Sequence, residues 1–124
     1  NNLENAKVFL DSKNYQKAIS IYNNILKGAN TGQNFIANFN IGIAYMGENN
    51  YGMALKHFDS LKDNYFSGFN SRPFYYPKAF LYSGLANFEL KNYRLAKSNI
   101  ETFFTNLGAS TGIVKREENG PGSA

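Results

Sequence analysis

The chain has 124 residues, of which 43% are hydrophobic and 18% are charged, so it is predicted to form one globular domain with a buried core. It contains no Cys, which excludes disulfides, thiolate zinc sites and a cysteine nucleophile. The formal net charge is only +4 and the lysines are spread along the chain, whereas a nucleic-acid-binding surface usually concentrates its positive charge.

No run of about 18 apolar residues, of the kind that spans a membrane, occurs in the chain. The chain begins with neither Met nor a basic and apolar leader. We therefore expect contact with a membrane only through an anchor that was removed upstream.

One short pattern occurs three times along the chain. In each copy a Tyr follows an Asn and precedes an Ala by three positions, and these residues are Tyr15, Tyr51 and Tyr93, at spacings of 36 and 42. A small residue stands nine positions before each Tyr, and apolar residues stand seven and ten positions after it. The chain is therefore predicted to contain three copies of one structural unit.

Apolar residues recur at spacings of three and four between these anchors, which predicts two amphipathic helices in each unit. The segments "DSKN", "GENN" and "LKN" separate the two helices of a unit, because Gly or Asn there can take the left-handed conformation that ends a helix. The sequence thus predicts an all-α fold, with helices near residues 2–12, 15–28, 33–48, 51–64, 77–90 and 93–107.

Small residues, among them Gly42 and Gly84, are predicted where the two helices of a hairpin cross closely. Large aromatic residues are predicted to pack adjacent hairpins together and to form a continuous core. These predicted core residues are Phe9, Tyr22, Tyr45, Phe58 and Phe103.

The second and third units resemble the tetratricopeptide repeat (TPR) family in the stretches "GIAYMGENNYGMALKHF" and "GLANFELKNYRLAKSNI". The family's signature is a small residue in the first helix, Asn-Tyr at the turn, Ala three positions later and then a large apolar residue. The resemblance implies a right-handed α-solenoid of three TPR helical hairpins, with repeats at about residues 1–30, 35–68 and 77–107.

The sequence departs from the TPR pattern in two respects. The Pro that usually closes each repeat is absent, and Asn30 and Phe66 stand near its place. Asn87 replaces the aromatic residue found at Phe9 and Tyr45, which leaves the packing of the third unit open.

TPR proteins hold an extended peptide or a partner's helix in a concave groove lined by the first helix of each unit, so the resemblance implies a protein or peptide partner. Asn40 and Lys78 fit two of the places with which some members hold a C-terminal carboxylate. Leu3, Lys7 and Tyr82 do not fit the others, so no charged clamp is expected. The residues expected to bind the partner are Phe39, Asn40, Ile43, Lys78, Tyr82, Leu85 and Phe88, and the wider implied lining adds Leu3, Lys7, Leu10, Ile36 and Leu81.

Two alternatives stay open for these surfaces. Several groove residues could instead pack against a second molecule, as in an oligomer. The aromatic stretch "NYFSGFNSRPFYYPK" could be a loop, near residues 65–76, that folds back over the hairpin ends, or one that closes over a small hydrophobic ligand. The loop candidates for such a contact are Phe69, Arg72, Phe74 and Tyr75.

Catalytic chemistry has little support in the sequence. His57 is the only His and is expected to be solvated or to cap a helix, because triads and His-based metal sites need partners that it lacks. Glu117 and Glu118 are adjacent rather than opposed across a cleft, and no Gly-rich phosphate-binding loop occurs. We therefore expect no enzyme, no metal site and no cofactor.

The leading hypothesis is a protein–protein interaction scaffold. A narrower version is an accessory of envelope assembly, because small bacterial TPR lipoproteins have similarly long repeats, and it favours a periplasmic or envelope-associated location over a cytoplasmic one. The competing hypotheses are a module that binds a small hydrophobic ligand under loop 65–76 and a regulatory module that binds nucleic acid. Residues 108–124 are expected to form a flexible polar tail, whose last five residues could be a linker or non-native.

Overall fold

The computed structural model describes residues 2–28, 30–66 and 75–111, and this part of the chain consists of helices joined by short turns, with no strand. The prediction of an all-α fold is confirmed. The helices are α1 (Asn2–Asp11), α2 (Tyr15–Leu26), α3 (Thr31–Gly47), α4 (Tyr51–Phe66), α5 (Tyr75–Glu89) and α6 (Tyr93–Thr111).

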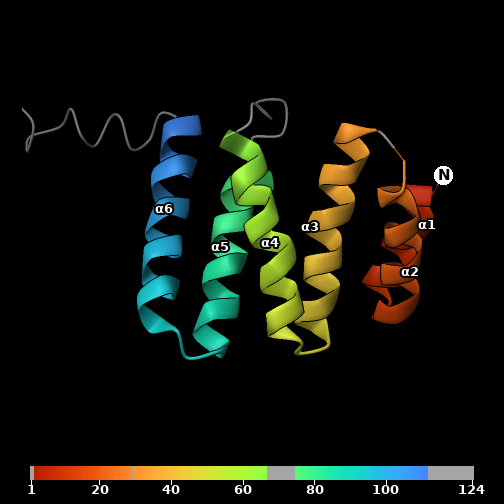
Figure 1. Ribbon diagram of the computed structural model, residues 1–124, viewed down its shortest axis with the longest axis horizontal. Coiled ribbons are helices and arrows are strands. Elements are labelled where there is room, and N and C mark those ends of the chain that lie inside the picture. The colour runs from red at the N-terminus through yellow and green to blue at the C-terminus, as the bar shows by residue number, and fades with distance from the viewer. Residues whose placement is uncertain (1, 29, 67–74, 112–124) are drawn as a thin grey trace, which may run out of the picture.

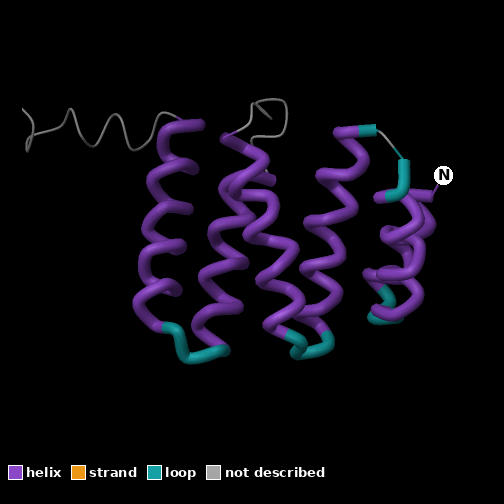
Figure 2. The backbone as a smooth tube through the Cα atoms, in the orientation of Figure 1, coloured by secondary structure: helices purple, strands orange, loops and turns teal. Residues whose placement is uncertain are grey.

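The helices lie in one row that begins with α1 and α2 and ends with α6 (Figure 1). Each helix packs against the next one in the chain, and α3 also contacts α1, as α5 contacts α3. The turns that join α1 to α2, α3 to α4 and α5 to α6 lie at the same edge of the row (Figure 2). Both α3 and α5 therefore pack against both helices of the hairpin that precedes them.

The three turns within the hairpins share one backbone geometry. Each contains a residue with positive φ, and these residues are Lys13, Asn49 and Lys91, again 36 and 42 positions apart. In each turn the residue after this one donates its N–H to the carbonyl five positions earlier, at 2.8–2.9 Å, as in a Schellman motif. The expectation that Gly or Asn takes this conformation holds for Asn49 only, since Lys occupies the other two turns.

The predicted helix starts at residues 2, 15, 51 and 93 agree with the structure, whereas other boundaries differ. Helix α3 begins two residues earlier than predicted because Asn30 caps it, its side chain accepting the Gln33 N–H at 2.9 Å. Helix α5 begins at Tyr75, two residues before Pro77, a position still within the first turn, where a missing N–H costs no hydrogen bond. Helix α6 continues to Thr111, four residues beyond its predicted end at residue 107.

The first two hairpins are held to their neighbours by two clusters of apolar side chains. One joins α1, α2 and α3 and includes Tyr22 and Ile41, and the other joins α3, α4 and α5 and includes Phe58 and Leu61. All four of these side chains are fully buried. Of the predicted core aromatics, Tyr22 and Phe58 are confirmed, whereas the remaining three, Phe9, Tyr45 and Phe103, are only partly buried.

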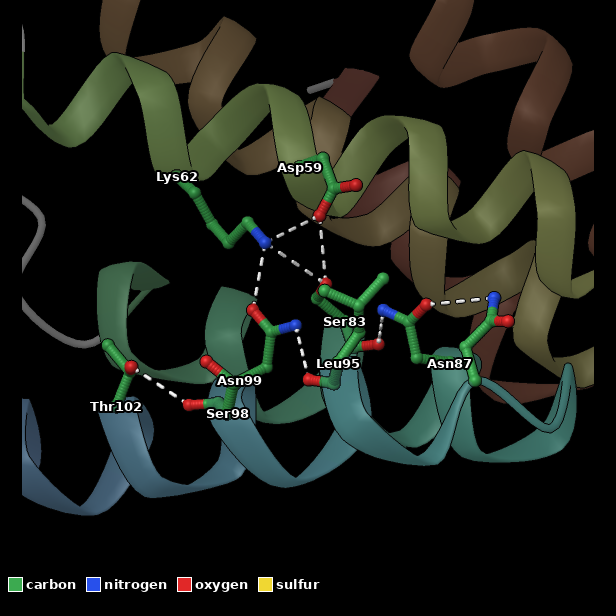
Figure 3. A network of polar contacts seen from close by, with 9 residues as sticks. Asp59, Lys62, Ser83, Asn87, Leu95, Ser98, Asn99 and Thr102 are labelled. Carbon is green, nitrogen blue, oxygen red and sulfur yellow. Dashed lines mark hydrogen bonds and ion pairs between the residues drawn. The ribbon is translucent and has the colours of Figure 1, made fainter.

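A network of polar side chains connects α4, α5 and α6 (Figure 3). The Lys62 amine donates to Asn99 Oδ1 at 2.8 Å and to Ser83 Oγ at 3.3 Å, and pairs with Asp59 at 2.8 Å. The Ser83 hydroxyl in turn donates to Asp59. Asn87, which replaces the aromatic residue of the other units, is 2% exposed and donates to the Ser83 carbonyl. The third hairpin is thus joined to the second by these hydrogen bonds as well as by the apolar contacts of α5 with the second cluster.

In the described ranges, none of the helices combines the length and the apolar character that crossing a membrane requires.

Candidate functional site

An open cleft of about 510 Å³ lies along the first helices of the three hairpins. Helices α1, α3 and α5 all contribute to it, together with the α1–α2 turn and the first residue of α2. The residues that line it are Lys7, Leu10, Asp11, Lys13, Tyr15, Phe39, Asn40, Ile43, Met46, Gly47 and Tyr82.

One side of the cleft is charged and exposed. The Lys7 amine donates to Asp11 Oδ1 at 2.6 Å, one helical turn further along α1. Both side chains are more than half exposed, so this pair contributes little to stability and is free to rearrange around a ligand. Lys13, in the neighbouring turn, adds a second exposed amine.

The other side of the cleft is aromatic. Phe39 meets Tyr82 edge to face with ring centroids 5.6 Å apart, and Tyr82 stacks on Phe58 at 5.5 Å. Phe39 was expected to stand free of the core, but it is only 6% exposed and belongs to the cluster around Phe58. The expectation is wrong in this respect because Phe39 fills the space between α3, α4 and α5 and shows only its edge to the cleft.

Asn40 is an uncharged polar residue of the lining. The residue as a whole is 8% exposed, but its amide atoms do not belong to the buried side-chain atoms that lack a hydrogen-bond partner in the described part of the chain. The amide is therefore not an unsatisfied buried group, and water in the open cleft serves as its hydrogen-bond partner in the free protein. Asn40 therefore offers one donor group and one acceptor to whatever occupies the cleft.

The structure brings together four of the seven residues expected to bind a partner, namely Phe39, Asn40, Ile43 and Tyr82. Lys78, Leu85 and Phe88 do not line the cleft. All three are exposed, Leu85 to 37% and Phe88 to 54%.

Sequence reasoning found part of the remaining lining. Lys7 and Leu10 were in the wider set implied by the TPR resemblance. Met46 could have been found from the helical period, since it lies one turn beyond Ile43 on the same face of α3. The others were missed because they belong to the hairpin turns, which had been given only a structural role: Asp11, Lys13, Tyr15 and Gly47.

Both ends of the stretch expected to form an aromatic loop are helical. Helix α4 runs to Phe66 and α5 begins at Tyr75, so Tyr75 is helical rather than part of a loop. Phe69, Arg72 and Phe74 lie outside the described residues.

His57 was expected to be solvated or to cap a helix, but its ring contacts two side chains of α3. Its ring stacks on Tyr45 with centroids 5.9 Å apart, and its Nδ1 lies 2.9 Å from Asn38 Oδ1, so the tautomer protonated at Nδ1 donates to that oxygen. Burial lowers the pKa of His57 below its usual value of 6.5, and the nearby Lys56 charge lowers it further. His57 thus ties α4 to α3 in its neutral form.

We expect the free energy of unfolding to fall between about pH 7 and pH 5. The unfolded chain binds a proton at its only His as the pH drops through 6.5, whereas the folded chain resists protonation down to its lowered pKa. The contribution of neutral His57 to the free energy of unfolding is therefore complete above the unfolded pKa, and it is lost as the pH falls from there to the folded pKa. Urea midpoints measured across this range test the assignment, with His57→Gln as the variant that should be nearly independent of pH. An equal pH dependence in both proteins would contradict it.

No three His, Asp or Glu side chains within residues 2–28, 30–66 and 75–111 are placed so that they could hold a metal ion. The chain matches no known family model, and neither a curated protein nor a solved structure is significantly similar to it. What can be said of its function therefore depends on its own residues and geometry.

Proposed function

We propose that the chain is a non-catalytic binding module in which three TPR-like hairpins form a right-handed α-solenoid and the cleft takes a peptide segment or helix of a partner protein. The observation that supports this most is Asn40. Asn40 lines the open cleft together with Ile43 and Tyr82, and no hydrogen bond within the described chain uses its side-chain amide.

A ligand in the cleft would replace water at this amide. A polypeptide backbone presents an N–H and a C=O at every residue, so a single segment can satisfy both the acceptor and the donor of Asn40. An apolar side chain of the same segment would lie against Ile43 and Tyr82, beside the amide. Lys7 and Lys13 at the rim would favour a segment with negative charge near that apolar residue.

The repeated geometry supports the solenoid arrangement. The first helices, α1, α3 and α5, all line the cleft, and α3 contacts both of the others. The three hairpin turns have the same geometry at the spacing of the sequence repeat. A partner segment that runs along these helices would contact all three units.

A small hydrophobic molecule is the second candidate occupant. The volume of about 510 Å³ falls within the range of small-molecule sites, which is about 300–1,000 Å³. A peptide is preferred because the cleft is open and has a charged rim, whereas small-molecule sites enclose most of the ligand surface.

Asn40→Leu is expected to weaken peptide binding about three- to tenfold, the effect of one lost hydrogen bond, without loss of stability. The substitution keeps roughly the size of the side chain and removes an amide that makes no hydrogen bond within the described chain, so the thermal midpoint should not fall. The probe is a peptide selected on the wild-type chain from a phage-displayed random library. Its affinity is measured by calorimetry.

Lys56→Ala is the matched control, since Lys56 lies on α4, is exposed and does not line the cleft. It should leave affinity unchanged. Equal binding by wild-type protein and Asn40→Leu, or a lower stability of Asn40→Leu, would refute the role assigned to the amide.

A further inference from the structure

The exposed apolar residues of the described chain gather at one end of the helix row. Seven large hydrophobic residues are exposed, and all but Val8 belong to α5, α6 or the turn between them. Four of them, Leu85, Phe88, Tyr93 and Phe104, are called the end face below. Phe88 and Tyr93 lie edge to face with centroids 5.5 Å apart, and Phe104 is 59% exposed.

In the earlier hairpins, residues at positions equivalent to those of the end face contact the first helix of the next hairpin. Moving back 42 residues takes Leu85 to Ile43 and Phe88 to Met46, and both of these pack against the cluster that contains Ala79 of α5. The same step takes Phe104 to Lys62, which bonds to Ser83 of α5.

The first hairpin shows the same use of these positions. A further step of 36 residues takes Met46 to Leu10 and Lys62 to Leu26. Both leucines belong to the cluster that contains Ala37 and Ile41 of α3. The positions of Phe88 and Phe104 are thus covered twice by a helix within the chain, and at the third hairpin both are exposed. The position of Leu85 is covered once, because the step of 36 residues from Ile43 leads to the exposed Lys7.

The two helices that fill such positions carry the same pattern. Helix α3 buries Ala37, Ile41 and Ala44, and α5 buries Ala79, Ser83 and Ala86, which are 42 positions further on. Counting Ala37 or Ala79 as the first place of this pattern, the eighth place is Ala44 or Ala86 and the fifth is Ile41 or Ser83. The small residues at the first and eighth places allow the helix backbone to approach its neighbour closely.

The residue at the fifth place matches the polarity of the side chain that it contacts in the preceding hairpin. Ser83 faces the Lys62 amine at 3.3 Å, whereas Ile41 shares a cluster with Leu26 at the position equivalent to Lys62. The end face has Phe104 at this position, which is apolar like Leu26. An occupant of the end face should therefore resemble α3 and carry an aliphatic residue at the fifth place.

We infer that the end face is a second interaction surface, separate from the cleft, that binds an amphipathic helix of a partner with a small residue, an aliphatic residue and a small residue at its first, fifth and eighth places. The inference rests on continuity with the two helix contacts already present in the chain. It does not depend on the proposed function of the cleft.

The probe is a synthetic peptide with the sequence of residues 31–47, acetylated and amidated, added to the isotope-labelled full chain and followed by NMR. The amides of Leu85, Phe88 and Phe104 are expected to shift in a saturable way. Ile41→Ser in the peptide should weaken binding by about fivefold or more, because an aliphatic contact is lost. Phe104→Lys in the protein should remove or reverse this preference, because it recreates the pairing of Lys62 with Ser83.

Three results would overturn the inference. Shifts confined to the cleft would place the peptide there instead. Dimers of the wild-type chain that Phe104→Lys dissociates in sedimentation would make the end face a contact between copies. Nuclear Overhauser contacts from Leu85 to Ile113 or Val114 would assign the surface to the chain's own C-terminal segment. Since Phe104 is exposed, Phe104→Lys should fold normally, and an unchanged spectrum outside the end face verifies this.

Discussion

Phe39→Ala is expected to lower the free energy of unfolding by about 3–5 kcal/mol, the usual cost of removing a buried Phe. Phe39 is 6% exposed and its ring meets Phe58 at 5.7 Å and Tyr82 at 5.6 Å. The substitution would leave a cavity where α3, α4 and α5 meet. Denaturation by guanidinium chloride gives the measurement.

Phe88→Ala is the matched control, because it removes the same ring from the equivalent side of another first helix. Phe88 is 54% exposed, so its loss should cost less than about 1 kcal/mol. Similar losses in the two variants would mean that Phe39 does not hold the α3–α5 contact. The expected loss also makes Phe39→Ala unsuitable as a test of binding, which is why Asn40 is used for that purpose.

Gly84→Leu is expected to lower the free energy of unfolding by about 1–3 kcal/mol through overpacking. A Cβ atom on Gly84 would lie 2.6 Å from Ile100 Cγ1 and 3.1 Å from the Ala96 carbonyl oxygen. The second of these is a backbone atom that cannot move without shifting α6. Chemical denaturation again measures the change.

Gly52→Leu provides the comparison, because a Cβ atom on Gly52 would meet nothing within 4 Å. Its stability should match or exceed that of the wild-type chain, since Leu favours helix over Gly. Gly47, which the sequence analysis places in a turn, is the last residue of α3. It is a poor control because a Cβ atom there would collide with the Tyr15 ring. If Gly84→Leu and Gly52→Leu were equally stable, the close crossing of α5 and α6 would be wrong.

The repeat made most of the fold predictable. Tyr15, Tyr51 and Tyr93 each begin a helix, because the preceding turn ends one helix and directly starts the next. Boundaries without such a marker were less accurate. The start of α3 depends on the Asn30 cap, and α6 runs on to Thr111 through Gly108, a residue type that often ends a helix.

Cleft residues were placed correctly from the sequence only where the side chain lines the cleft without also packing in the core. Asn40 and Ile43 were found because they share the face of α3 that lies away from α4. Phe39 was assigned to that face alone, although a large ring at the edge of a helix can also reach the core. The polar interior around Lys62 and Ser83 was missed because single polar residues in an amphipathic pattern are normally taken as solvated, and only the packing of α4 on α5 buries them.

The central claim is that the cleft along α1, α3 and α5 binds a polypeptide segment and that Asn40 contacts it. The most direct measurement is an NMR titration of the isotope-labelled chain with the peptide selected from the phage library, in which the side-chain amide resonances of Asn40 are observed together with the backbone. The proposal predicts large shifts of the Asn40 side-chain amide and of backbone amides near Lys7, Ile43 and Tyr82, with the α4 residues around Lys56 unchanged. Saturable binding that leaves the Asn40 side-chain amide unshifted, or failure to select any binding peptide, would contradict it.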